Sequence, residues 1–111
     1  MHIDLSGHHV EITDGIREAV HQKLEKIESH YPNLDAVNVI VTVERNSQKV
    51  EMSTQFMGAP ISVHDSEQDM YAAITACVKK LDAKLASKKG AKKANLHEKP
   101  QLTDNEDLES L

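Results

Sequence analysis

The chain has 111 residues, of which 39% are hydrophobic and 28% charged, as in a single globular domain. Aromatic residues make up only 3% of it, which argues against RNA-binding modules that stack bases on two or three aromatics of a sheet. The single cysteine excludes an internal disulfide and a cysteine-built zinc site. No apolar run is long enough to span a bilayer and no signal peptide opens the chain, so we expect a cytoplasmic protein without membrane contact.

The charges are segregated along the chain. The formal net charge is −5, yet residues 1–78 carry 5 basic and 12 acidic side chains. Residues 79–93 carry 7 lysines and one aspartate, and residues 94–111 carry 1 lysine and 5 acids. An acidic body with one dense lysine segment predicts that this segment contacts a polyanion.

The first part of the chain predicts a strand followed by a helix. Residues 2–5 alternate polar and apolar side chains, as a short strand does, and residues 6–9 are typical of a turn. Thr13 is the expected N-cap of a helix that runs to about His30. Its apolar residues recur at helical spacing: Ile16, Ala19, Val20, Leu24 and Ile27.

The middle of the chain predicts an antiparallel meander. Residues 37–44 place four valines on one face, which indicates a strand with one buried side. After a turn at residues 45–48, residues 49–57 alternate in the same way. Residues 58–60 form a tight link to a short strand at residues 61–64.

The last part of the chain predicts a long amphipathic helix and a tail. Ser66 and Asp69 have the spacing of a capping box, and apolar residues then recur at helical spacing from Met70. Gly90 is expected to end this helix, because glycine costs about 1 kcal/mol relative to alanine in a helix interior. Residues 94–111 are acidic and aperiodic, which predicts a disordered tail after a domain of residues 1–93.

The element order is therefore β-α-β-β-β-α, which predicts an α+β fold. We expect a four-stranded mixed sheet with both helices packed on one face and the other face open to water. The first strand and the strand at residues 37–44 flank a helix. They are therefore expected to be parallel, joined by a right-handed crossover.

Lysines on both helices form the candidate binding site. Two or three lysines would be typical of a solvated helix end, but seven within residues 79–93 favour phosphate binding. Because lysine is a point charge, the contact is expected with a nucleic-acid backbone rather than with bases. The candidate residues are Lys23, Lys26, Lys79, Lys80, Lys84, Lys88, Lys89, Lys92 and Lys93.

The other reactive residues form no catalytic or metal-binding pattern. The histidines lack the spacing of a helical metal site, and the adjacent His8 and His9 would point apart in extended chain. Cys77 lies among the apolar positions of the second helix, where cysteine is more often a core residue than a nucleophile. We therefore expect no enzyme activity, metal, cofactor or small-molecule substrate.

Three short runs are informative in combination: Asp69-Met70-Tyr71-Ala72-Ala73-Ile74, Glu11-Ile12-Thr13, and the valine-rich strand that ends in Val43-Glu44. Together they resemble the ribosome hibernation promoting factor family, which also includes the ribosome-associated translation inhibitor. The resemblance covers residues 1 to about 90 and includes the order of elements.

The resemblance implies a small cytoplasmic bacterial protein that binds the small ribosomal subunit under stress. Such a protein lies on ribosomal RNA in the A- and P-site region and blocks translation without catalysis. The matching basic positions are Lys23, Lys26 and Lys80. The sequence departs from the family at Ala83 and Ser87, where arginine and lysine are expected. Its acidic tail resembles that of the inhibitor-type members.

Two other functions fit the same residues. A general double-stranded RNA-binding module also packs two helices on a sheet, and it would bind a bare A-form duplex. A protein–protein adaptor would instead present the acidic tail to a basic partner.

Overall fold

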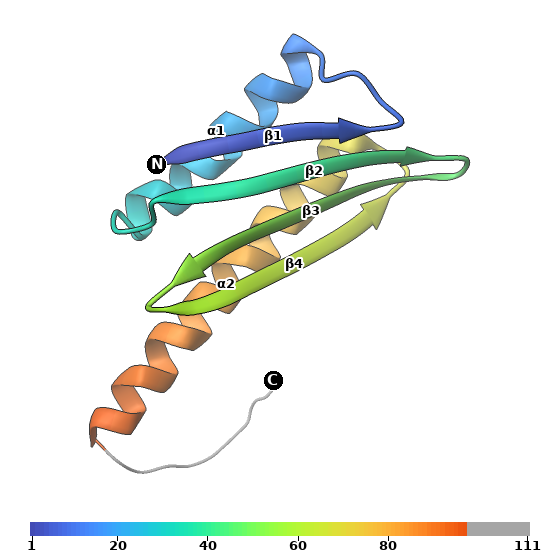
Figure 1. Ribbon diagram of the computed structural model, residues 1–111. Coiled ribbons are helices and arrows are strands. Elements are labelled where there is room, and N and C mark those ends of the chain that lie inside the picture. Colours follow the sequence, from blue (N-terminus) through green and yellow to red (C-terminus); the bar gives the residue numbers. More distant parts are fainter. Residues whose placement is uncertain (98–111) are drawn as a thin grey trace.

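A computed structural model describes residues 1–97 of the chain, with side chains described as far as Gly90. It contains a four-stranded sheet in the order β1-β2-β3-β4, in which β1 and β2 are parallel and the other neighbours antiparallel (Figure 1). The predicted order of elements and the mixed sheet are confirmed. The elements are β1 (His2–His8), α1 (Asp14–His30), β2 (Ala36–Glu44), β3 (Ser47–Phe56), β4 (Ala59–Glu67) and α2 (Met70–His97).

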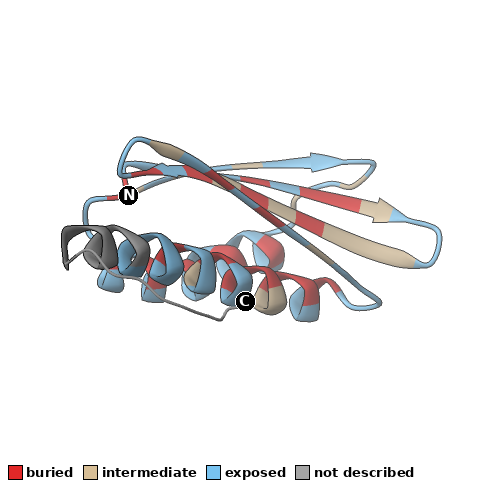
Figure 2. Ribbon diagram, turned by 90° about the horizontal axis from the view of Figure 1, so that it is seen from below, coloured by how far each residue is buried: buried red, intermediate tan, exposed pale blue. Residues whose placement is uncertain are grey.

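Both helices cover the same face of the sheet, and the core lies between these two layers (Figure 2). Alternation along β2 buries Val37, Val39 and Val41 completely, while Asn38 and Ile40 remain exposed on the other face. Within residues 1–97 no element covers that second face, so its side chains meet water. The predicted layer arrangement is confirmed.

β1 is longer than predicted, because the residues expected to turn are paired with β2. Ser6, Gly7 and His8 lie beside residues 40–42 in parallel register, and the chain leaves the strand at His9, where φ is 64°. A β-carbon at Gly7 would lie 2.4 Å from the carbonyl oxygen of Val10. Glycine is therefore needed where the departing chain crosses back over the strand.

The helix caps agree with the prediction for α1 and correct it for α2. The Thr13 hydroxyl accepts a hydrogen bond from the Ile16 amide at 3.2 Å, as expected of an N-cap. At α2, the Asp69 carboxylate accepts from the Ala72 amide at 2.9 Å. The predicted capping box is wrong because Ser66 belongs to β4, which is longer than the predicted strand at residues 61–64.

The two hairpin turns are shorter than predicted. The pairs Glu44–Ser47 and Phe56–Ala59 each close a loop of two residues, so residues predicted as turn or link join the strands. The second loop, Met57–Gly58, has φ values of 56° and 77°. Positive φ at both central residues is typical of the turns that match the twist of a hairpin.

α2 continues through Gly90 to His97, so the predicted helix end is wrong. The cost of one glycine is about 1 kcal/mol, and the alanines and lysines on both sides of it are strong helix formers. The predicted tail, residues 94–111, begins inside this helix, and from residue 98 it lies outside the described residues. Neither helix within residues 1–97 has the length and apolarity that crossing a bilayer would require.

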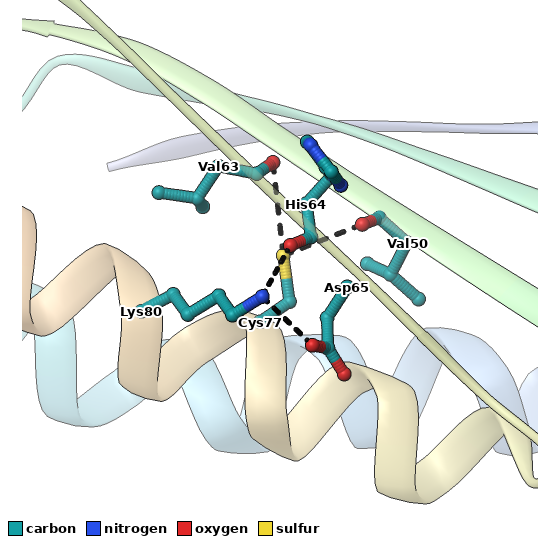
Figure 3. A network of polar contacts seen from close by, with 6 residues as sticks. All are labelled: Val50, Val63, His64, Asp65, Cys77 and Lys80. Atoms are coloured by element: carbon teal, nitrogen blue, oxygen red, sulfur yellow. Dashed lines mark hydrogen bonds and ion pairs between the residues drawn. The ribbon is translucent and has the colours of Figure 1, made fainter.

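Cys77 is a core residue, as predicted. It is fully buried, and its thiol lies 3.5 Å from the carbonyl oxygen of Val50 and 3.9 Å from that of Val63 (Figure 3). Burial raises the pKa of the thiol to about 12. The thiolate that nucleophilic chemistry requires is therefore scarce at neutral pH.

Gly7→Ala should destabilise the fold, because the new β-carbon would meet backbone rather than a movable side chain. Forced overpacking of this kind costs about 1–3 kcal/mol. Gly90→Ala is the matched control, because a β-carbon there meets nothing within 4 Å. It should stabilise the chain by about 0.5–1 kcal/mol. Urea unfolding monitored by circular dichroism measures both changes, and equal shifts of the two midpoints would contradict the assigned role of Gly7.

Cys77 should resist thiol reagents in the folded protein. At pH 8 an aromatic disulfide reagent should label the native chain no faster than the chain opens, because the thiol is buried and protonated. In denaturant the thiol returns to an ordinary pKa of about 8.5 and should react at once. Immediate labelling of a sample that still melts cooperatively would show that Cys77 is accessible.

Candidate nucleic-acid interface

A groove of about 310 Å³ lies between α1 and α2. Three of the predicted lysines line it: Lys23 and Lys26 from α1, and Lys79 from α2. The groove exists because each helix packs its apolar side on the sheet, so that the polar flanks of the two helices face each other above the core. Its other lining residues are Gln22, Ile27, Thr75, Val78 and Asp82.

The three groove lysines are available to an anion. All three are exposed, and among the described side chains none of them forms an ion pair. Each follows or precedes a buried residue of its helix, so it lies at the edge of the apolar side that packs on the core. Ammonium groups on two facing helices can contact one phosphate backbone from both sides.

Asp82 is the acidic residue among those that line this groove. Its carboxylate lies 3.8 Å from the Nδ1 atom of His30, at the end of α1. Tyr31 lies beside this pair, and its pKa is raised, first by burial and then by the Asp82 charge. The carboxylate repels anions at its own end of the groove.

Lys80 differs from its neighbour Lys79 because its ammonium group is engaged on β4. It donates a hydrogen bond to the His64 carbonyl oxygen at 2.9 Å and pairs with Asp65 at 2.9 Å (Figure 3). The hydrogen bond from Lys80 to the Asp65 carboxylate holds the pKa of Asp65 below its usual range, against the effect of burial. Asp65 in turn raises the pKa of Glu67. The ammonium group of Lys80 is thus engaged by a carboxylate and a carbonyl group within the protein.

The remaining lysines lie further along α2. Lys84, Lys88 and Lys89 are exposed, and the ammonium group of Lys89 lies 6.0 Å from the centre of the Tyr31 ring, within the range of a cation–π contact. Lys92 and Lys93 belong to α2, but their side chains are outside the described part. The structure therefore groups three predicted lysines in the groove and distributes the others along α2.

His8 and His9 lie at the end of β1, and their ring centres are 4.2 Å apart in an edge-on arrangement. The chain is not extended at His9, where φ is 64°, so the expectation for an extended chain does not apply there. Among the side chains that the structure describes, as far as residue 90, no three His, Cys, Asp or Glu residues gather as metal ligands would.

Comparison with known proteins places this arrangement in one family. The family described as sigma 54 modulation protein / S30EA ribosomal protein matches residues 3–93. The ribosome hibernation promoting factors of Pseudomonas putida, Azotobacter vinelandii and Escherichia coli K12 are 42%, 37% and 33% identical over 89 residues. These alignments cover 80% of this chain and 87%, 83% and 94% of the respective relatives.

Two solved structures have the same architecture. The N-terminal domain of Thermus thermophilus Protein Y superposes with a TM-score of 0.70 at 29% identity, covering 77% of this chain and 96% of that one. A ribosomal subunit interface protein from Coxiella burnetii gives a TM-score of 0.77 at 24% identity, covering 81% and 99%. The predicted fold is confirmed by both. The chain belongs to the sigma 54 modulation protein / S30EA ribosomal protein family, among the ribosome hibernation promoting factors.

Proposed function

We propose that this protein is a non-catalytic translation inhibitor that binds the small ribosomal subunit in its decoding region, where the A and P sites lie. The observation that carries the proposal is the groove between α1 and α2, which is lined by three lysines without ion-pair partners among the described side chains, in a chain of net charge −5. The names of the bacterial relatives, ribosome hibernation promoting factor, support a role on idle ribosomes in the cytoplasm.

The groove would act by binding ribosomal RNA through its backbone. Lys23 and Lys26 contact phosphates from α1, and Lys79 contacts them from α2. Lysine ammonium groups recognise charge and carry no base code, so the shape of the folded RNA selects the site. A domain seated there excludes messenger and transfer RNA by occupying their space. No bond is made or broken, so no catalytic residue is needed.

The lysines outside the groove would extend this contact along α2. Lys84, Lys88 and Lys89 are exposed beyond the groove, and Lys92 and Lys93 follow them in the same helix. Lys80 contributes less attraction than its position suggests, because Asp65 offsets its charge at 2.9 Å. We therefore assign the strongest phosphate contacts to Lys23, Lys26 and Lys79.

The double change Lys23→Glu and Lys26→Glu should abolish most binding to purified small ribosomal subunits in a co-sedimentation assay. A charged hydrogen bond contributes about 1.5 kcal/mol or more, so each lost contact should weaken affinity about tenfold. Arg45→Glu is the matched control, because Arg45 is exposed in the β2–β3 turn and does not line the groove. Parent-like binding by the folded double variant would overturn the proposal, and tight binding of the parent to a plain RNA duplex would favour a general duplex-binding module.

Binding should weaken steeply with monovalent salt at constant magnesium. If about five lysines neutralise phosphates, the slope of log affinity against log salt should be roughly −3.5 to −4.5. The Lys23→Glu and Lys26→Glu variant should lose roughly 1.4 to 1.8 of that slope, since two contacts are removed. A parent slope near zero would show that phosphates are not the main partner.

A further inference from the structure

We propose that Tyr71 is a stacking platform for an unpaired RNA base beside the lysine groove, an inference that rests on the function proposed above. The chain has three aromatic residues, and two of them are core residues. Tyr31 and Phe56 are buried and pack edge to face, with ring centres 5.5 Å apart. Tyr71 is 50% exposed, so it alone presents an aromatic ring to a ligand.

Tyr71 shares its surroundings with the groove lysines. It lines a hollow of about 500 Å³ that begins at the start of α2 and includes Lys23, Thr75 and Lys79. Those three residues also line the groove between the helices, so the two spaces adjoin. A phosphate held by Lys23 and Lys79 would therefore place the base of its nucleotide within reach of the Tyr71 ring.

The end of the Tyr71 side chain lies beside Gly15 in the first turn of α1. The Tyr71 hydroxyl lies 2.8 Å from the place where a β-carbon of residue 15 would be, closer than any side chain there would allow. The Tyr71 side chain thus extends from α2 across to α1, beside the one residue of that turn without a side chain. Glycine at position 15 leaves room for the hydroxyl end of the Tyr71 side chain in this place.

The other lining residues fit a base better than a second phosphate. Glu67 and Asp69 bring carboxylates to the Tyr71 end of the hollow, where they would repel phosphate and can accept hydrogen bonds from base amino groups. Lysines at one end and an aromatic ring with carboxylates at the other match the phosphate and base of one nucleotide. A base in a duplex has no free face to offer, so the partner is single-stranded.

The affinity of Tyr71→Ala and Tyr71→Phe for purified small ribosomal subunits tests the stack. Loss of one base–aromatic stack should weaken binding of the alanine variant about 5- to 150-fold, whereas phenylalanine should bind within about twofold of the parent. A thermal melt controls for folding. Parent-like binding by the alanine variant would overturn the stack, and an equal loss in both variants would show that the hydroxyl, not the ring, makes the contact.

Tyrosine fluorescence gives a direct readout. The chain has no tryptophan, so Tyr31→Phe leaves Tyr71 as its fluorophore. A short single-stranded oligoribonucleotide should quench this emission, and the same strand with abasic sites should bind through its phosphates without quenching. Equal quenching by both strands would overturn the assignment.

A double-mutant cycle with Gly15 tests the geometry. Gly15→Ala should weaken binding when residue 71 is tyrosine, because the new β-carbon displaces the hydroxyl. It should have no effect in the Tyr71→Phe background, since no other atom of residue 71 lies within 4 Å of that β-carbon. Equal effects in both backgrounds would contradict the arrangement.

The variants also separate the two proposals. If Lys23→Glu with Lys26→Glu loses binding and Tyr71→Ala does not, only the stacking proposal is wrong. If the lysine variant binds normally, the proposed function itself is wrong.

Discussion

Packing of two helices against one face of a single sheet is the constraint on which the binding surface depends. Alternation along β2 and β3 sends every second side chain to the helices, and each helix has only one apolar side with which to meet them. The helices therefore lie next to each other, and their polar flanks meet at the groove between them. Lysines beside the apolar stripes are then placed at the groove between them, without any residue dedicated to positioning them.

The parts of the fold that could be predicted from the sequence depend on local periodicity. The other parts depend on contacts with elements that are distant in the sequence. The apolar spacing of α1, the valines of β2 and the Thr13 cap can be recognised within a few residues. Ser6 and Gly7 have turn-like side chains, yet they extend β1 because β2 offers hydrogen bonds there. Gly90 has a weak preference that its helix-forming neighbours outweigh.

For the candidate site too, some properties are local in the sequence and others depend on the fold. Clustering of lysines on two helices is visible in the sequence, because charge and helical spacing are local properties. Their availability is not, since Lys80 is engaged by a carbonyl group 16 positions earlier in the chain, on β4. The approach of Tyr71 to Gly15 joins the first turns of two helices and is equally invisible before the fold is known.

Lys79 and Lys80 show why a charge count overstates the binding capacity of a segment. They are adjacent in sequence but 100° apart around the helix, so one faces α1 and the other faces β4. A net charge of −5 is compatible with a polyanion partner, because the charges nearest to the partner decide the binding. Salt screens the acidic body beyond about 8–10 Å, whereas the groove lysines would touch the phosphates directly. The affinity then depends on the groove lysines that form no ion pair within the described part of the protein. Repulsion between the acidic surface and the RNA acts mainly on the rate of association.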